Sequence, residues 1–451
     1  MLTIKTNSRK VKPGDTFVAL RGLSSDGHSY IESAIANGAT KIIAEEGNYE
    51  VETIIVENTR EYLEEYLLET YRDMLNEMTL IGMTGTNGKT TSCYLIYEAL
   101  NRLSTKCAYI GTIGFYLDEK VCDLPNTSPD ICDLYEMFIE AYEKGYRHIV
   151  MEVSSQGLSY GRLNKIPFDY AIFTNLTQDH LDYHKTMENY ALAKQKLFKQ
   201  IKENGCGIVN IDDSYSDYYK MGHYVTYGFG DSDYKIKNCT LTAYGSSFEL
   251  LDYKINTKLI GNYNIYNVAC AVIVLDKLNY SKEEIELVVS KLLPPPGRMD
   301  IIKYKTNTIV IDYAHTPDAM ENIFATVKDL PHNKIYVVFG CTGSRDRKKR
   351  PVMMQMALNN SEYVFVTSDD LHEELFEDIV VDMLENNQLN HYIVEKDRGK
   401  AISMAISKLN ENDILLILGK GHEEAIIIGN NKISFNDKKE VLKLLSEKVE
   451  I

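Results

Sequence analysis

Residues 83–91 read Met83-Thr84-Gly85-Thr86-Asn87-Gly88-Lys89-Thr90-Thr91. They follow the apolar run Met78–Ile81 and precede a segment whose apolar residues recur at helical spacing. A strand, a glycine-rich turn and a helix in this order place backbone N–H groups and a helix N-terminus around phosphate groups. We therefore expect a bound nucleotide, with Lys89 at its β- and γ-phosphates and Mg²⁺ on the hydroxyl of Thr90 or Thr91.

This stretch departs from the general phosphate-loop pattern GxxxxGK[ST] at one position. Met83 stands where the pattern has its first glycine, so Gly85 and Gly88 have to make the turn. The alternative is a glycine-rich turn with an incidental lysine. The flanking strand and helix favour nucleotide binding.

Composition limits the class of protein. A chain of 451 residues with 44% hydrophobic and 25% charged residues is typical of a globular protein, which at this length has two or three domains. The net charge of −16 argues against non-specific nucleic-acid binding but not against an anionic small substrate. No signal-peptide or membrane-spanning run is present, so we expect a cytoplasmic protein with no membrane partner. We also expect a monomer with no nucleic-acid partner. The eight cysteines form no CxxC and are expected to be reduced core residues.

The pattern of strands and helices predicts an α/β fold with three domains, at residues 1–76, 77–296 and 297–451. The first has a Pro-Gly turn at Pro13. The second alternates strands and helices, which predicts a parallel sheet with helices on both faces and a locally antiparallel segment over Tyr224–Tyr253. Pro294–Gly297 is the expected linker. The third block alternates again and predicts a second, Rossmann-like α/β domain. The expected strands are Thr16–Leu20, Lys41–Ala44, Thr53–Val56, Cys107–Tyr109, His148–Glu152, Tyr170–Thr174, Gly207–Asn210, Thr308–Asp312, Ile335–Phe339, Tyr363–Val366 and Asp413–Leu418.

Several polar clusters follow these strands, where open α/β sheets bind their ligands. Glu152 ends one strand and is suited to Mg²⁺. The loop Asp179–His184 holds two histidines and two aspartates, which fit either a metal site or a polar loop. Lys194 lies in an amphipathic helical segment and, taken alone, reads as a surface lysine. Gly261–Asn267 is suited to N-capping or to contacting a base or ribose.

The third block carries further clusters. Asp312–Asp318 and Gly419–Glu423 each follow a strand. Gly340–Pro351 gathers five basic residues in a glycine-bearing loop, which in so acidic a chain indicates an anion site.

Together, and in this order, the clusters resemble the Mur ligase family, and within it the MurE type. The residues that carry the resemblance are Thr86–Thr90, Asp179–His184 (DHLDYH), Asp312–Asp318 (DYAHTPD) and Gly419–Glu423 (GKGHE). It spans essentially the whole chain, since Asn7–Ala19 resembles the family's uridine-nucleotide-binding opening. The family consists of ATP-dependent amide ligases of cell-wall precursor synthesis.

The resemblance implies a role for particular residues. Lys89, His180, Lys194 and Arg298 would be catalytic. The UDP-linked substrate would contact Ser8, Thr127, Ser128, Ser154 and Arg162. ATP would contact Gly85, Thr86, Asn87, Gly88, Lys89, Thr90, Thr91, Asn267, Arg298 and Asp312. Mg²⁺ would be held by Thr90, Glu152 and His180, and a second Mg²⁺ by Lys194, the lysine being carbamylated. The incoming amino acid would contact Arg345, Asp369, Asp370, His372, Gly419 and Glu423.

The resemblance also implies a reaction. A carboxylate of UDP-N-acetylmuramoyl-L-alanyl-D-glutamate would attack the γ-phosphate of ATP, and the amine of a free amino acid would displace phosphate from the resulting acyl phosphate. Closure of the third domain would complete the site.

One motif departs from the family. Asp369-Asp370-Leu371-His372 stands where Asp-Asn-Pro-Arg is usual, so the arginine that would pair the distal carboxylate of diaminopimelate is missing. A histidine cannot offer the two parallel hydrogen bonds of a guanidinium. The aspartates favour an amino acid with a side-chain ammonium, such as lysine or ornithine.

Two alternatives remain open at this point. A family ligase acting on another carboxylate (a folate, a cell-wall-like polymer or a secondary metabolite) would keep the same ATP chemistry. A non-catalytic paralogue that binds UDP-linked precursors would keep only the binding residues. The retained Lys89, Glu152, His180, Lys194 and Arg298 argue against the second.

Overall fold

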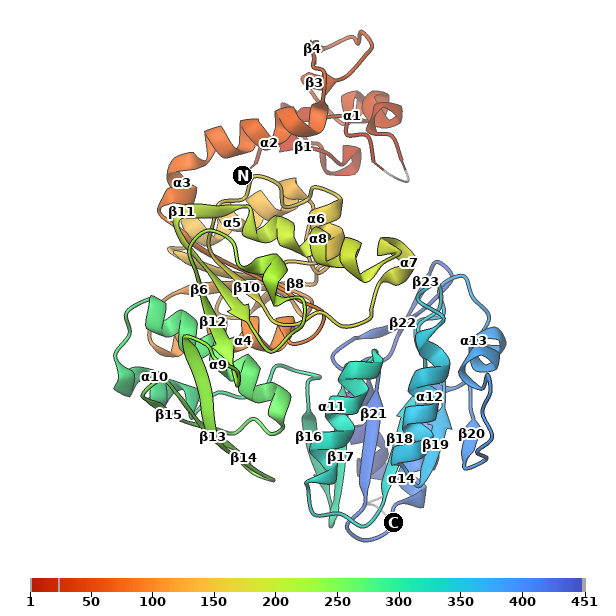
Figure 1. Cartoon of the computed structure of the whole chain (residues 1–451). Coiled ribbons are helices and arrows are strands. Elements are labelled where there is room, and N and C mark those ends of the chain that lie inside the picture. Colours follow the sequence, from red (N-terminus) through yellow and green to blue (C-terminus); the bar gives the residue numbers. More distant parts are fainter. Residues whose placement is uncertain (1, 23–24, 448–451) are drawn as a thin grey trace.

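The computed structural model describes residues 2–22 and 25–447, which form three larger sheets that follow one another along the chain and one two-stranded sheet (Figure 1). Within those residues no helix combines the length and the apolar character needed to cross a membrane. All cysteines are free, and six of the eight are buried as expected, whereas Cys122 is exposed and Cys239 is partly exposed.

The first sheet has four parallel strands in sequence order. Alternate residues of a strand face opposite sides, so Phe17 and Ile42 pack under α1 (Ile31–Ala36). Their neighbours Val18 and Ile43 instead join a core that continues into the central domain. The strands are β1 (Ile4–Lys5), β2 (Thr16–Val18), β3 (Lys41–Ala44) and β4 (Glu52–Ile55).

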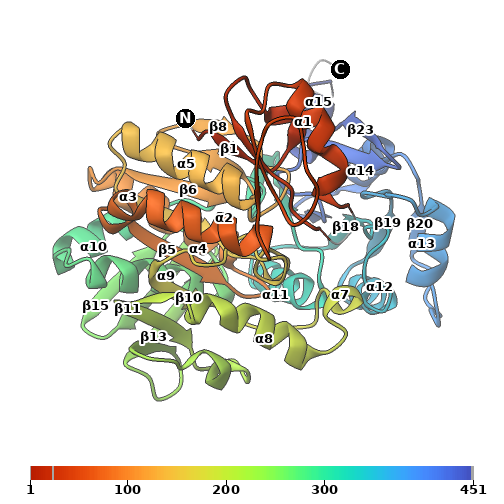
Figure 2. The ribbon, with the colours of Figure 1, turned by 90° about the horizontal axis from the view of Figure 1, so that it is seen from above.

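The helix α2 (Thr59–Thr70) joins the first two domains. It lies against the central domain in both views (Figures 1 and 2) and contributes Leu63 and Leu67 to the shared core. The short α3 (Arg72–Asn76) follows it. The first two domains therefore share one core. The domain boundaries after residues 76 and 296 stay predictions.

The central sheet has eleven strands, in the order β15-β14-β13-β12-β11-β10-β5-β9-β6-β7-β8. The strands from β13 to β6 pair in parallel, as predicted, and antiparallel strands extend both edges. The predicted antiparallel segment is found in β13–β15, whereas Tyr224–Gly228 (β12) pairs in parallel. The strands are β5 (Thr79–Thr84), β6 (Cys107–Gly111), β7 (Gly114–Tyr116), β8 (Lys120–Cys122), β9 (His148–Glu152), β10 (Phe168–Phe173), β11 (Ile201–Asn210), β12, β13 (Tyr234–Thr242), β14 (Gly245–Leu250) and β15 (Tyr253–Thr257).

Helices cover both faces of this sheet, as predicted. Successive residues of β5 show the two faces, because Leu80 packs with the helices of one core and Ile81 with those of the other. The first core includes α5 (Ile131–Glu143), α6 (Ser155–Ser159) and α8 (Met187–Phe198). The second includes α4 (Lys89–Arg102), α9 (Asn262–Lys277) and α10 (Lys282–Val289).

The third sheet has the order β16-β17-β21-β18-β19-β20. It is parallel except for the edge strand β16. One face packs against α11 (Pro317–Lys328), α12 (Lys349–Asn360) and α13 (Phe376–Met383), and the other against α14 (Arg398–Lys408) and α15 (Asp437–Glu447). The strands are β16 (Asp300–Tyr304), β17 (Asn307–Asp312), β18 (Ile335–Phe339), β19 (Tyr363–Val366), β20 (Tyr392–Val394) and β21 (Ile414–Leu418), and a separate hairpin comprises β22 (Ala425–Ile428) and β23 (Asn431–Ser434).

The predicted linker Pro294–Gly297 has no regular structure and lies between α10 and β16. Gly297 has φ +68°, and a Cβ there would lie 2.1 Å from the backbone nitrogen of His422. The linker therefore packs directly on the loop that follows β21.

Arg398 ties together the two loops that follow β19 and β21. It is fully buried, pairs with Asp437 at 2.7 Å and donates to the carbonyls of Ser368 and Leu418 at 3.2 and 2.9 Å. We predict that Arg398→Met lowers the free energy of unfolding by about 3–5 kcal/mol, because Asp437 is left buried and unpaired. Chemical denaturation measures this. The exposed pair of Arg102 with Glu98 provides the control Arg102→Met, which should cost less than about 0.5 kcal/mol. Equal losses in the two variants would contradict the prediction.

Candidate functional site

The phosphate loop joins β5 to α4, and its two glycines make the turn as predicted. Gly85 has φ +150° and Gly88 has φ +85°. Added Cβ atoms would meet Thr174 Oγ1 at 1.9 Å and Asn267 Oδ1 at 2.5 Å. Met83 is instead buried within the strand. Only glycine fits at these two positions.

Lys89 opens α4 and folds back over the loop. Its Nζ donates to the carbonyls of Gly85 and Thr86 at 3.0 and 2.8 Å. Burial lowers the pKa of Lys89 below its usual range, against the opposing charges of Glu152 and Asp179. Burying an ammonium without a paired charge is costly, so an anion bound at Lys89 would stabilise this arrangement.

Glu152 ends β9 and is fully buried beside the loop. Its Oε1 accepts from Tyr109 and from the backbone of Thr112 at 2.5 and 2.9 Å. Its Oε2 accepts from the hydroxyls of Thr90 and Thr112, both at 3.0 Å. Four donors fix the orientation of this carboxylate, with one edge on the hydroxyl of Thr90.

Lys194 is not the surface residue that its helix pattern indicates when taken alone. It is buried on α8, its Nζ donates to the carbonyl of Gly85 at 2.7 Å, and it lies over the ring of Tyr190. Burial, and then the charge of Lys89, lowers the pKa of Lys194 well below its usual range. This favours the neutral amine.

The loop before α7 (Leu181–His184) places Asp179 and His180 in the same region. Their Oδ2 and Nε2 atoms are 3.4 Å apart. His184 is bonded to Ser155 at 2.9 Å, and its ring stacks on that of Tyr190. The group of potential metal ligands found among the described residues includes neither histidine. Burial lowers the pKa of His180.

The third domain closes over this part of the central domain. Arg298 Nη2 donates to the hydroxyl of Thr90 at 3.2 Å, while its Nε has no partner among the described residues. Asn87 donates to Asp318 at 2.5 Å. Lys349 Nζ lies 3.8 Å from Asp179, and both side chains are buried. Although burial raises it, the pKa of Asp179 is lowered overall by the charges of His180, Lys349 and His315.

Two cavities meet at the loop. The larger, of about 470 Å³, runs between the central and third domains. The predicted residues that line it are Thr86, Asn87, Gly88, Lys89, Thr90, Thr91, Thr127, Glu152, Ser154, Arg162, His180, Lys194, Arg298, Arg345, Asp369, Asp370, His372, Gly419 and Glu423. The smaller, of about 280 Å³, is lined by Asn267 and Asp312 and shares Asn87, Gly88, Thr91 and Arg298 with the first.

The smaller cavity corrects one interpretation. The asparagines at the start of α9 do not cap the helix, because Gly261 is the N-cap and no side chain caps it. Asn264 and Asn267 bond each other and the residues around them, and both line the cavity. Their position fits the second interpretation, a contact with a base or ribose.

Three predicted residues lie outside both linings. Gly85 forms the turn behind Lys89 and Lys194. Ser128 is buried behind Ser154, whose backbone donates to its Oγ at 2.9 Å. Ser8 is buried in the first domain.

The basic loop 340–351 is not one anion site, which corrects the prediction. Arg350 is fully buried and pairs with Glu374 and Asp382, both at 2.7 Å. Arg347 also pairs with Asp382. Of the five basic residues, Arg345 and Lys349 line the larger cavity.

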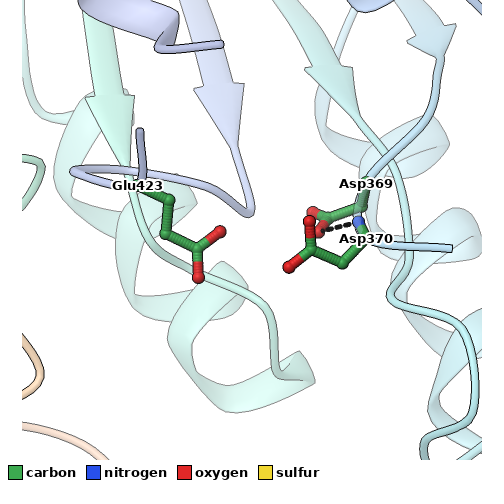
Figure 3. Close-up of side chains that lie close together, drawn as sticks. All are labelled: Asp369, Asp370 and Glu423. Atoms are coloured by element: carbon green, nitrogen blue, oxygen red, sulfur yellow. Dashed lines mark hydrogen bonds between the residues drawn. The ribbon is translucent and has the colours of Figure 1, made fainter. Parts of the chain in front are cut away.

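The far end of this cavity is acidic. Asp369 and Asp370 follow β19, Glu423 follows β21, and oxygens of all three lie within 4.8 Å of one another (Figure 3). Lys420 lies among them, with its Nζ 2.8 Å from Asp370 and 2.6 Å from Glu423. Burial raises the pKa of Glu423 to about 7.

Comparisons with known proteins assign this architecture. Residues 3–79 match the model of the Mur ligase family catalytic domain, residues 83–275 the Mur ligase middle domain, and residues 297–421 the Mur ligase glutamate ligase domain. A UDP-N-acetylmuramoyl-L-alanyl-D-glutamate–2,6-diaminopimelate ligase of Fusobacterium nucleatum is 38% identical over 96% of this chain and 92% of its own length. The chain belongs to the Mur ligase family. An Aquifex aeolicus ligase of the same name is also 38% identical, over 98% of this chain and 93% of its own.

Solved structures of Mur ligases share the fold. A structure of a UDP-N-acetylmuramoyl-L-alanyl-D-glutamate–2,6-diaminopimelate ligase has 31% identity and a TM-score of 0.68, covering 100% of this chain and 95% of that one. MurF ligase from Thermotoga maritima in complex with ADP has 21% identity and a TM-score of 0.71, covering 100% and 98%. The predicted three-domain α/β architecture and the predicted ATP-dependent amide ligase are confirmed.

Some residues of the site stand in the sequence motifs but had no predicted role. Asp179 and Asp318 stand in the motifs DHLDYH and DYAHTPD, and Lys420 stands in GKGHE. The structure shows that each also pairs outside its own motif: Asp179 with Lys349, Asp318 with Asn87 and Lys420 with Asp370. Motif membership was the available signal, but these partners are fifty or more residues apart, so sequence spacing could not reveal the pairs.

We predict that Lys89→Ala leaves the protein folded but reduces phosphate release at least about a hundredfold, because a cation at the transferring phosphoryl group is lost. Gly85 and Gly88 still make the turn, so thermal unfolding should change little. Lys144→Ala, at an exposed lysine that pairs with Glu140, is the control. Activity within tenfold of the unmodified protein would sink the prediction.

Proposed function

We propose that the protein uses ATP to join a diamino acid to UDP-N-acetylmuramoyl-L-alanyl-D-glutamate. One observation carries this proposal: a single cavity connects the phosphate loop at one end with the carboxylates of Asp369, Asp370 and Glu423 at the other. The named substrate of the Fusobacterium nucleatum and Aquifex aeolicus relatives supports the choice of UDP-linked acceptor. We further propose a cytoplasmic monomer.

In the first step a carboxylate of the acceptor attacks the γ-phosphorus of ATP, giving an acyl phosphate and ADP. Lys89 and Arg298 offset the charge that spreads over the phosphoryl oxygens. Arg298 belongs to the third domain and reaches Thr90 of the central domain. The step therefore depends on the closed arrangement of the two domains.

Mg²⁺ would be held beside the loop by Thr90, Glu152 and His180, and a second Mg²⁺ by a carbamylated Lys194. The hydroxyl of Thr90 and the carboxylate of Glu152 are oxygen donors 3.0 Å apart, which is the donor type that Mg²⁺ prefers. When bound, the ion would neutralise phosphate charge.

Burial prepares Lys194 for carbamylation. An amine adds to CO₂ only in its neutral form, and the lowered pKa of Lys194 supplies that form. The nitrogen attacks the carbon of CO₂ and loses a proton, and the product carries a negative charge. That charge would lie beside Lys89, which lacks an anionic contact within hydrogen-bonding distance among the described residues.

In the second step the amine of the amino acid attacks the acyl carbon, and phosphate leaves from the tetrahedral intermediate. Thr127, Ser154 and Arg162 line the cavity where the acceptor would lie, with Ser128 behind them. Ser8 is proposed to contact the uridine, and Arg345 the α-carboxylate of the amino acid.

Phosphate release with UDP-N-acetylmuramoyl-L-alanyl-D-glutamate, ATP and single amino acids tests the proposal. Release that requires both the acceptor and a diamino acid supports it. Release with a folate or another carboxylate but not with this acceptor would assign a different substrate. No release with any pair would assign a binding protein.

We predict that Lys194→Ala loses most activity and regains part of it with added short-chain carboxylates, which supply the missing anion. The adjacent Lys196, whose Nζ is bonded to the Leu158 carbonyl at 3.4 Å, provides the control Lys196→Ala. The mass of the intact protein would report an added CO₂. Full activity without carboxylate would overturn the prediction.

We predict that lysine or ornithine is preferred to meso-diaminopimelate, contrary to the names of the relatives. His372 lines the cavity in place of the arginine that would pair a distal carboxylate, and Asp369 and Asp370 add negative charge. The measurement is kcat/KM for the three amino acids. An advantage of tenfold or more for diaminopimelate would refute the prediction and would mean that another cation, such as Lys348 or Lys349, performs the role of the missing arginine.

A further inference from the structure

Lys420 lies at the centre of the acidic end of the cavity. Its side chain is fully buried, and three carboxylates surround it: Glu423 at 2.6 Å, Asp370 at 2.8 Å and Asp369 at 3.9 Å. These carboxylates come from two loops, one after β19 and the other after β21 (Figure 3). Lys420 is thus the cation that joins the two loops.

The same three carboxylates lie close enough together to suggest a cation site. The ammonium of Lys420 already occupies that role, because it donates to two of them. A metal ion would have to displace a buried lysine from its counter-charges, which is costly. The three carboxylates therefore already have their cation, the ammonium of Lys420.

The bonds to Lys420 use only part of each carboxylate. Asp370 takes both Lys420 and the backbone N–H of Ile427 on Oδ1, at 2.8 and 2.9 Å. Within the described part of the chain no group donates to its Oδ2. Glu423 takes Lys420 on Oε2, and its Oε1 accepts from Tyr313 at 3.3 Å. Both side chains line the cavity, which leaves an oxygen edge of Asp370 for a substrate.

We infer that Lys420 is a positioning residue for the incoming amino acid, holding Asp370 and Glu423 in place so that Oδ2 of Asp370 receives the side-chain ammonium of that amino acid. The inference rests on the proposed function. Lys420 itself makes no bond to the substrate. It fixes the two carboxylates and offsets their mutual repulsion, which otherwise would favour protonating one of them.

The electrostatics of the cluster agree with this role. Burial raises the pKa of Glu423 to about 7, the charge of Lys420 lowers it, and Asp369 and Asp370 raise it. Tyr313 also contacts the carboxyl, and Arg398 lies near enough to interact with it. Losing Lys420 would therefore move the pKa of Glu423 upwards, whereas losing the charge of Asp370 would move it downwards.

The experiment compares Lys420→Gln, Lys420→Arg and Asp370→Asn in the whole enzyme. Lys420→Gln should raise KM for lysine or ornithine about tenfold or more, since charge-assisted bonds that fix the carboxylates are lost. KM for ATP should stay within about twofold. Lys420→Arg should recover part of the loss. The exposed Lys439, which pairs with Glu424, provides the control Lys439→Gln.

The pH profile separates positioning from mere structural support. The acidic limb of kcat/KM for the amino acid should move to higher pH in Lys420→Gln and to lower pH in Asp370→Asn. A weakened fold would not move the limb in opposite directions in the two variants. If Lys420→Gln does not fold, as judged by thermal unfolding, Asp370→Asn alone still tests the direction of the shift.

The outcomes distinguish this inference from the proposed function. An unmodified protein that releases no phosphate with any amino acid refutes the proposed function. An active protein whose Lys420→Gln variant keeps its KM for the amino acid, or raises both KM values equally, refutes the inference. A limb that moves the same way in both variants also refutes it.

Discussion

The carbonyl oxygen of Gly85 accepts hydrogen bonds from two buried lysines. Lys89 approaches from the start of α4 at 3.0 Å, and Lys194 from α8 at 2.7 Å. Two ammonium groups so close together repel each other, and after burial itself the charge of Lys89 lowers the pKa of Lys194. The arrangement is stable only where anions are supplied, either by the fixed carboxylate of Glu152 or by the negative groups of a nucleotide and a carbamate. The turn requires glycine at position 85 because any Cβ there would collide with Thr174.

Two contacts, one ionic and one to a neutral hydroxyl, join the third domain to the central one. Lys349 is buried against Asp179, and Arg298 reaches the hydroxyl of Thr90 with its Nε still unpaired. Each of these contacts crosses from one domain to the other within the cavity, so the closed arrangement and the phosphate site are one structure. An ionic contact between buried side chains is strong only when the geometry is good. Closure of the third domain therefore depends on correct placement of the phosphate loop.

The sequence predicted most of the fold because its strands are short apolar runs that end in polar motifs. β3, β9, β18 and β19 have the predicted bounds. The edges were less predictable: the meander β6–β8 and the hairpin β22–β23 depend on pairing with neighbouring segments, which a local pattern does not encode. In the site, the sequence motifs identified residues that line the cavity, but they did not reveal which charged residues pair with one another. The basic loop 340–351 shows this, since the local run of Arg and Lys looked like one anion site while Arg350 pairs with residues in and near α13.

The tight contact between the linker and the loop after β21 restricts where this enzyme can change its amino acid. A Cβ at Gly297 would reach the backbone of His422, and a Cβ at Gly421 would lie 2.6 Å from the carbonyl of Gly297. The hinge of the third domain and the loop Gly419–Glu423 are thus packed backbone against backbone, and a substitution that reshapes one also displaces the other. The other wall of the pocket, the loop after β19, is joined to the loop Gly419–Glu423 through the side chain of Lys420. A change of specificity is therefore easier to accommodate in the loop after β19. That loop includes Asp370 and His372, where the sequence departs from the motif expected for the family.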